Sequence, residues 1–180
     1  YNLADPTRRL EDLVVLSAEE AREKRHIDVR LGYRATSVDL SGQVVYAVDR
    51  KTDREYAIGF DRLVFATGAE PAMPAVDGAD RLEGIFAVRA LHQAEALKAY
   101  LDSCQPRSAL IVGCGASGLE IGHALRTRGL DVTITDKEAT ILPAFGQTVA
   151  RTVERELEAM GVKSHKSASV LFFTGEGGHV

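Results

Sequence analysis

The feature that most constrains the fold of this chain is a glycine-rich turn between a short apolar strand and a helix. The apolar run at 109–112 leads into the pattern Gly-x-Gly-x-x-Gly, whose glycines are Gly113, Gly115 and Gly118. Such a turn lets the backbone approach a pyrophosphate and points the unpaired N–H groups of the helix N-terminus at the anion. The six-residue pattern alone is weak evidence, but its position between a strand and a helix makes it specific.

The residues after the turn predict a helix that ends near Gly129 and a second short strand at 131–135. Asp136 closes this strand, eighteen residues after Gly118. A carboxylate at this position can accept hydrogen bonds from a ribose 2′-hydroxyl and repels a 2′-phosphate. The residues therefore predict a dinucleotide site that favours NADH over NADPH. Lys137 follows the carboxylate directly and is compatible with some tolerance of a 2′-phosphate.

Composition narrows the possible partners. The 180 residues are 45% hydrophobic and 27% charged, with a net charge of −4, which argues against nucleic acid as a partner. No apolar run approaches the ~20 residues of a membrane helix, and no export signal precedes the first elements. The two cysteines, Cys104 and Cys114, form neither a redox pair nor a metal cluster, so we expect a cytoplasmic protein without a metal.

Hydrophobic patterning predicts the remaining elements. Ser17 can cap a helix, and three short alternating segments close together predict an antiparallel meander rather than crossover units. A buried strand at 61–66 is expected to end at Thr67 and Gly68. The expected helices are 18–25, 91–103 and 147–160, and the expected further strands are 28–31, 35–40, 43–49, 55–60 and 169–173.

The segment 63–71, with Ala-Thr-Gly at 66–68, precedes the glycine pattern by some 45 residues, and this combination resembles the flavin-dependent pyridine nucleotide-disulfide oxidoreductases. The similarity is to the coenzyme A-disulfide reductase and NADH oxidase branch. It implies an α/β, Rossmann-like fold, with a three-layer parallel sheet, an antiparallel meander and two partial lobes. Residues 1–90 would be the C-terminal part of an FAD-binding lobe, and residues 91–180 a truncated NAD(P)-binding lobe.

The resemblance also implies which residues contact each cofactor. The backbone at Thr67 and Gly68 would touch FAD, and Ala35, where many relatives have Val, would lie against its adenine. Glu120 would hydrogen-bond the nicotinamide amide. Ala116 and Ser117 replace an aromatic residue and Ile of many relatives, which implies a more open or more polar nicotinamide pocket. The expected NAD(P) contacts are Gly113, Gly115, Ala116, Ser117, Gly118, Glu120, Asp136 and Lys137.

The function that the resemblance implies is transfer of a hydride from NAD(P)H to FAD, and then of electrons to a small-molecule disulfide or to oxygen, in a homodimer. In the family, the redox cysteine and the other FAD-binding segments lie outside the region that matches this chain. We therefore expect no catalytic residue within these 180 residues and no activity from them alone. Two alternatives stay open: a ferredoxin-reductase-like flavoprotein that needs no active cysteine, and a non-catalytic NAD-binding sensor domain.

Overall fold

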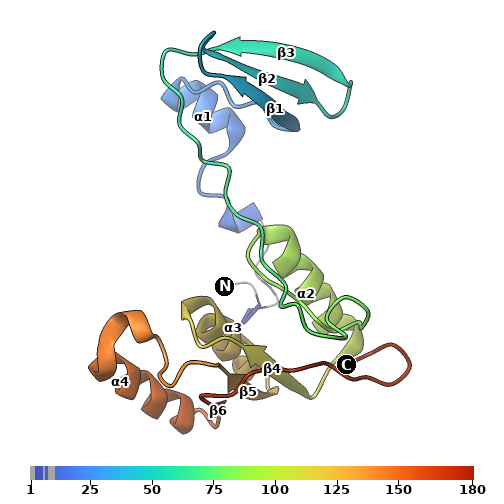
Figure 1. The fold of residues 1–180 in the computed structure, drawn as a ribbon, viewed down its shortest axis with the longest axis vertical. Coiled ribbons are helices and arrows are strands. Elements are labelled where there is room, and N and C mark those ends of the chain that lie inside the picture. Colours follow the sequence, from blue (N-terminus) through green and yellow to red (C-terminus); the bar gives the residue numbers. More distant parts are fainter. Residues whose placement is uncertain (1–2, 6, 8–10) are drawn as a thin grey trace. The chain divides into compact units, whose positions relative to one another are not determined.

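The computed structural model describes residues 3–5, 7 and 11–180, which divide by their contacts into two units. One unit comprises residues 10–69, and the other comprises residues 1–9 and 70–180. We call them the 10–69 unit and the 70–180 unit (Figure 1). By contacts alone, residues 70–90 belong with the residues that follow them. The division at residue 90 concerns which cofactor each part binds, and it stays a prediction.

The 10–69 unit begins with a 3-10 turn, Glu11–Leu13, and the helix α1, Ala18–Arg25. The Ser17 hydroxyl accepts a hydrogen bond from the Glu20 N–H at 3.1 Å, so the predicted cap is confirmed. The Glu20 carboxylate does not reach back to complete a capping box; it accepts from Lys24 Nζ at 2.6 Å, one turn along the helix.

An antiparallel meander follows, as predicted. Its strands are β1 (Tyr33–Asp39), β2 (Val44–Asp49) and β3 (Arg54–Gly59), in the order β1-β2-β3. The first turn is closed by the Asp39 carboxylate, which accepts from the Ser41 and Gly42 N–H groups at 2.9 Å each. Among the described residues of this unit, the buried side chains are small: Ala21 of α1 and Ala47 of β2 are 3% and 5% exposed.

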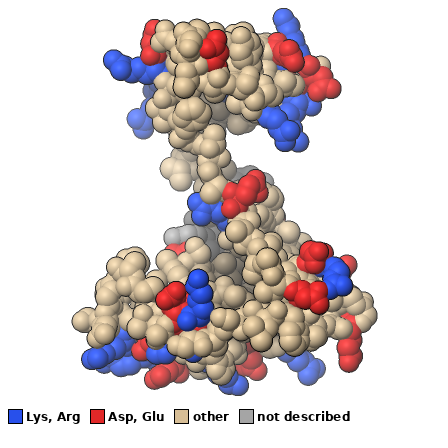
Figure 2. All heavy atoms as spheres, viewed as in Figure 1, with Lys and Arg blue, Asp and Glu red and all other residues tan. Residues whose placement is uncertain are grey.

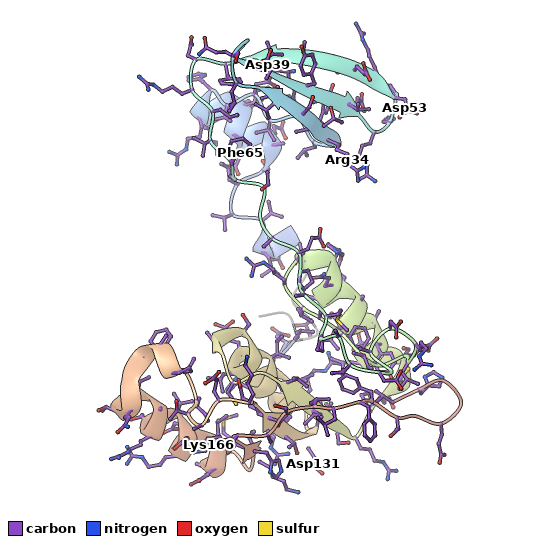
Figure 3. All side chains as sticks on the ribbon, in the orientation of Figure 1. Arg34, Asp39, Asp53, Phe65, Asp131 and Lys166 are labelled. Carbon is purple, nitrogen blue, oxygen red and sulfur yellow. The ribbon has the colours of Figure 1, made fainter. Side chains whose placement is uncertain are left out.

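Two predicted strands of this unit are wrong. Residues 28–31 form no strand; Asp28 and Arg30 instead make a local ion pair at 2.9 Å. Residues 61–66 form no strand, and the side chains of Val64 and Phe65 are 82% and 68% exposed (Phe65 is labelled in Figure 3). An apolar run becomes a strand only where another strand supplies hydrogen-bond partners, and no described strand runs beside this one.

The 70–180 unit is built around a parallel sheet of β4 (Ser108–Val112), β5 (Asp131–Thr135) and β6 (Lys163–His165), in the order β4-β5-β6. The helix α2 (Leu91–Cys104) precedes the sheet. The helix α3 (Ala116–Thr127) connects β4 to β5, and a 3-10 turn (Pro143–Phe145) with α4 (Gly146–Ala159) connects β5 to β6. The predicted helices 91–103 and 147–160 are therefore confirmed to within one residue at each end.

The strand predicted at 169–173 is wrong, because that segment makes only an isolated bridge between Asp77 and Phe172. The strand after α4 is β6, whose three residues are polar and exposed, so hydrophobic patterning could not indicate it. It pairs with β5 through the backbone, from Thr133 opposite Lys163 to Thr135 opposite His165.

The core of this unit lies on one face of the parallel sheet. Val132 and Ile134 are buried there, and Gly122 brings α3 close to both of them. Ala109 and Ile111 of β4 pack into the same core, whereas Leu110 and Val112, on the opposite face of the strand, are 51% and 50% exposed. The α/β, Rossmann-like fold class is confirmed by this β-α-β-α-β order with a parallel sheet.

Basic and acidic side chains are interspersed on the face of each unit that Figure 2 presents. Within the described part of the chain, no helix is long and apolar enough to cross a bilayer. The same residues contain no group of three or more His, Cys, Asp and Glu side chains arranged to hold a metal ion.

Candidate functional site

The glycine-rich turn connects β4 to α3, and the helix packs closely against the turn at Gly118. Gly113 has φ 117°, a conformation that favours glycine, and its N–H donates to the Thr135 carbonyl of β5 at 2.8 Å. A Cβ on Gly118 would collide with the Gly113 carbonyl oxygen, so only glycine permits this approach of helix to strand. At Gly115, by contrast, a Cβ would meet nothing within 4 Å, which leaves open space in front of the turn.

The N-terminus of α3 faces this open space without a side-chain cap. Gly115 is the N-cap residue, and no described side chain hydrogen-bonds to the first turn in its place. Gly115, Ala116 and Ser117 are all exposed. The N–H groups of the first turn, which have no partner within the helix, together with the positive end of the helix dipole, are therefore available to an anion.

Asp136 lies beside the turn, at the end of β5. Its Oδ2 accepts a hydrogen bond from the Cys114 N–H at 2.5 Å, and its Oδ1 accepts from the Glu138 N–H at 2.9 Å. Burial acts to raise the pKa of Asp136, but these N–H groups and the charge of Lys137 outweigh it, so the pKa lies below the ordinary value. The carboxylate is therefore charged at neutral pH, and its remaining lone pairs can accept further hydrogen bonds.

The backbone around Asp136 is held by the segment 165–168, which begins at the last residue of β6. The Asp136 N–H donates to the His165 carbonyl at 3.0 Å, and the Asp136 carbonyl accepts from the Ala168 N–H at 2.9 Å. The Ser167 N–H donates to the Glu138 carbonyl at 3.0 Å. We call these three hydrogen bonds the backbone clamp. No sequence motif could indicate it, because it is made by main-chain groups at the end of a polar strand.

The structure brings most of the predicted NAD(P) residues together. The glycines of the turn, Ala116, Ser117 and Asp136 follow the carboxyl ends of β4 and β5, where the Asp136 carboxylate accepts a hydrogen bond from the Cys114 N–H. Glu120 is exposed on α3, within the first two turns from the N-terminus, and Lys137 is exposed directly after Asp136. That these residues contact a nicotinamide dinucleotide stays a prediction.

The predicted FAD residues belong to the other unit. Ala35 lies in β1, opposite Ala47, next to an irregularity in the strand register. Thr67 and Gly68 are exposed in the extended segment after β3. Gly68 has φ 74°, and a Cβ added to it would meet nothing within 4 Å. All three positions are open to solvent, which is compatible with a ligand lying against the backbone, and their role also stays a prediction.

Cys114, within the turn, is a buried packing residue with an exposed fraction of 1%. Burial raises the pKa of its thiol, and the nearby Asp136 carboxylate raises it further. The thiol is therefore protonated at neutral pH and is not a nucleophile. Cys104, at the end of α2, is a free, exposed cysteine.

With this geometry in place, comparison with known proteins identifies the class. The pyridine nucleotide-disulphide oxidoreductase family matches residues 4–180, and the chain belongs to this family, as the sequence predicted. It is 32% identical, over 164 residues, to the NADH oxidase of Methanocaldococcus jannaschii; the match covers 91% of this chain and 36% of that protein. It is also 32% identical, over 153 residues, to the biphenyl dioxygenase system ferredoxin–NAD(+) reductase component of Paraburkholderia xenovorans, covering 84% of this chain and 36% of that protein.

Among solved structures, the reduced CoADR-RHD protein of Bacillus anthracis has the same fold. Its TM-score is 0.88 at 23% sequence identity, and the match covers 96% of this chain and 31% of that one. The chain thus spans about a third of the length of each of these three relatives.

Proposed function

We propose that the full-length protein is a flavin-dependent oxidoreductase that takes a hydride from NADH, and that the 70–180 unit supplies part of its NADH site. The observation that carries the proposal is the uncapped N-terminus of α3, with the charged Asp136 carboxylate tied to the same turn by the Cys114 N–H. An anion-binding helix end beside a hydrogen-bond acceptor suits the pyrophosphate and ribose of a dinucleotide.

The residues of the turn fit such a ligand. The open space in front of Gly115 gives the pyrophosphate access to the N–H groups of α3, and Asp136 would accept hydrogen bonds from the adenosine ribose. Glu120 would accept a hydrogen bond from the nicotinamide amide. Asp136 favours NADH because its negative charge opposes a 2′-phosphate, and Lys137 reduces this preference without removing it.

The 10–69 unit would contribute backbone contacts to FAD through Ala35, Thr67 and Gly68. These residues and those of the glycine-rich turn would hold and orient the two cofactors, and a bound flavin would supply the redox chemistry. We propose a small-molecule disulfide or oxygen as the final acceptor, in a cytoplasmic homodimer. The assignment of residues 1–90 to the FAD-binding lobe and 91–180 to the NADH-binding lobe is part of this proposal.

An anaerobic NADH titration of the full-length protein, followed by its visible absorption spectrum, tests the proposal. We expect NADH to bleach a bound flavin and to produce a long-wavelength charge-transfer band, which arises when a thiolate lies beside the flavin. A full-length protein that binds NADH but contains no flavin would contradict the proposal and favour a sensor domain.

A second candidate function is ferredoxin reduction, and the 32% identity to a protein named as a ferredoxin–NAD(+) reductase component favours it. Such a protein passes electrons from its flavin to an iron–sulfur partner and needs no active cysteine. In the same titration, bleaching of the flavin without a charge-transfer band would favour this second function over disulfide reduction.

A further inference from the structure

The backbone clamp around Asp136 is connected to α4 by an ion pair. Lys166 lies within the clamp segment 165–168, and its Nζ contacts Glu154 Oε1 of α4 at 2.6 Å (Lys166 is labelled in Figure 3). The Glu154 side chain is 25% exposed and the Lys166 side chain 36% exposed, so both are more enclosed than the usual surface pair. The pair therefore links the clamp segment to a helix that lies outside the clamp itself.

Helix α4 is a firm anchor for this pair. Ala150 and Leu157, on either side of Glu154 in the sequence, are 4% and 6% exposed and are the buried residues of this helix. These buried side chains fix α4 and so hold the Glu154 carboxylate in place. The carboxylate in turn holds Lys166. The segment 165–168 itself has no apolar side chain large enough to anchor it: its residues are His, Lys, Ser and Ala.

The pair also lies within electrostatic range of the glycine-rich turn. The pKa of the Cys114 thiol is raised by burial first and by Asp136 second, but Lys166 lowers it and Glu154 raises it again. The turn, Asp136 and the ion pair are therefore parts of one neighbourhood, although they come from separate segments of the chain.

We propose that the Glu154–Lys166 ion pair positions Asp136 for the adenosine ribose of NADH by holding the backbone clamp in place. The proposal rests on the proposed function, in which Asp136 binds that ribose. Glu154 and Lys166 are positioning residues: they act through the main chain of 165–168 and do not themselves touch the ligand. The Lys166 ammonium group is paired with Glu154, and the proposal gives it no direct contact with a 2′-phosphate.

The test uses the full-length protein with the substitutions Glu154→Gln and Lys166→Met, and the double substitution E154K/K166E, which restores the pair with reversed charges. Binding of NADH, NADPH and ADP-ribose is measured by calorimetry, and amide hydrogen exchange is followed at Asp136 and Ala168. ADP-ribose contains the pyrophosphate and the adenosine ribose without the nicotinamide, so it isolates the proposed effect.

We expect each single substitution to weaken binding of NADH and ADP-ribose about two- to fivefold, the range expected for losing one partly exposed ion pair. Exchange at the two amides should become faster, and the charge-reversed double variant should recover most of both losses. The matched control is Lys24→Met, which removes another Lys–Glu pair with a 2.6 Å contact, in α1, and should leave the affinities unchanged.

Two results would overturn the inference. The first is unchanged affinity and unchanged exchange in both single variants, with wild-type protein that binds NADH normally. The second is a loss confined to NADPH in the Lys166→Met variant, without rescue by charge reversal, which would mean that Lys166 contacts a 2′-phosphate directly. Wild-type protein that binds neither NADH nor ADP-ribose would instead overturn the proposed function and, with it, the role given to the pair.

Discussion

Asp136 has a structural role in the glycine-rich turn and a proposed role in ligand binding. Both of its oxygens accept main-chain hydrogen bonds, from Cys114 at 2.5 Å and from Glu138 at 2.9 Å, so the carboxylate closes the glycine-rich turn even without a ligand. In the proposed function, the same carboxylate also binds the ribose. A substitution at this position therefore alters the turn and the ligand contact together.

We expect Asp136→Ala in the full-length protein to weaken NADH binding about tenfold or more, because each hydrogen bond to a charged group contributes about 1.5–3 kcal/mol. NADPH binding should weaken less, since the repulsion of its 2′-phosphate disappears as well. Asp136→Asn keeps a side-chain oxygen for the Cys114 N–H and should show an intermediate loss. Dissociation constants for both dinucleotides check this, and an unchanged ratio of NADH to NADPH affinity would contradict the preference assigned to Asp136.

The close packing of Gly118 leads to a prediction about stability rather than binding. A Cβ at this position collides with the Gly113 carbonyl, and a main-chain group cannot move aside as a flexible side chain can. We expect Gly118→Val to lower the free energy of unfolding by about 1–3 kcal/mol. Gly115→Ala is the matched control, because a methyl group there meets nothing within 4 Å and should cost little stability. Urea denaturation compares the variants, and equal losses at both glycines would count against this account of the turn.

At the scale of elements, α2 is tied to the end of α3 by an ion pair between Asp102 and Arg128. The Arg128 side chain is only 14% exposed, and within the described residues its Nη1 is buried without a hydrogen-bond partner. The hydrogen bond from Arg128 lowers the pKa of Asp102. The contribution of Asp102 to stability is therefore present above the pKa of an unfolded aspartate and is lost as the pH falls through the lowered folded value.

We expect Asp102→Asn to lower the melting temperature at pH 7, because Arg128 then keeps its charge without its partner. The difference from wild type should shrink as the pH falls from about 3.9, the ordinary pKa of an aspartate, toward the lowered pKa of folded Asp102, where protonation of the wild-type carboxylate removes the pair. Thermal melts between pH 7 and pH 3 measure it. Lys24→Met, which removes an exposed pair on α1, is expected to have a much smaller effect at every pH.

The elements that could be predicted from the sequence are those whose signals are local. The Ser17 cap, the three strands of the meander and the β4–α3–β5 order all depend on side chains close in sequence, and all three predictions are confirmed. The strand β6 could not be predicted, because its polar residues owe their conformation to backbone pairing with β5.

For the candidate site, motif spacing was sufficient to place Asp136 beside the glycine-rich turn, which the structure confirms as a geometric arrangement. It was not sufficient to find the backbone clamp or the Glu154–Lys166 pair. Both depend on how α4 packs against the segment at the end of β6. No residue pattern indicates that the side chains of Glu154 and Lys166, twelve residues apart, come into contact.

At the scale of the whole molecule, two apolar surfaces are of the kind that further strands or helices cover. Val64 and Phe65 are largely exposed in a segment that forms no strand, and Leu110 and Val112 leave one face of the parallel sheet half exposed. Exposed apolar side chains in a row are costly in water, at about 25 cal/mol for each Å². The chain spans about a third of the length of the relatives named above, and the additional residues of a protein of that length can cover these surfaces.

We therefore predict that residues 61–66, which form no strand in the structure, gain main-chain hydrogen-bond partners in the full-length protein. Amide hydrogen exchange compares the two forms directly. In the full-length protein the amides of Val64 and Phe65 should exchange at least about tenfold more slowly, because main-chain hydrogen bonds protect them. The β2 amides, which are paired in the meander, should exchange at similar rates in both and serve as the internal reference. Equally fast exchange of residues 61–66 in both forms would contradict the predicted protection of this segment.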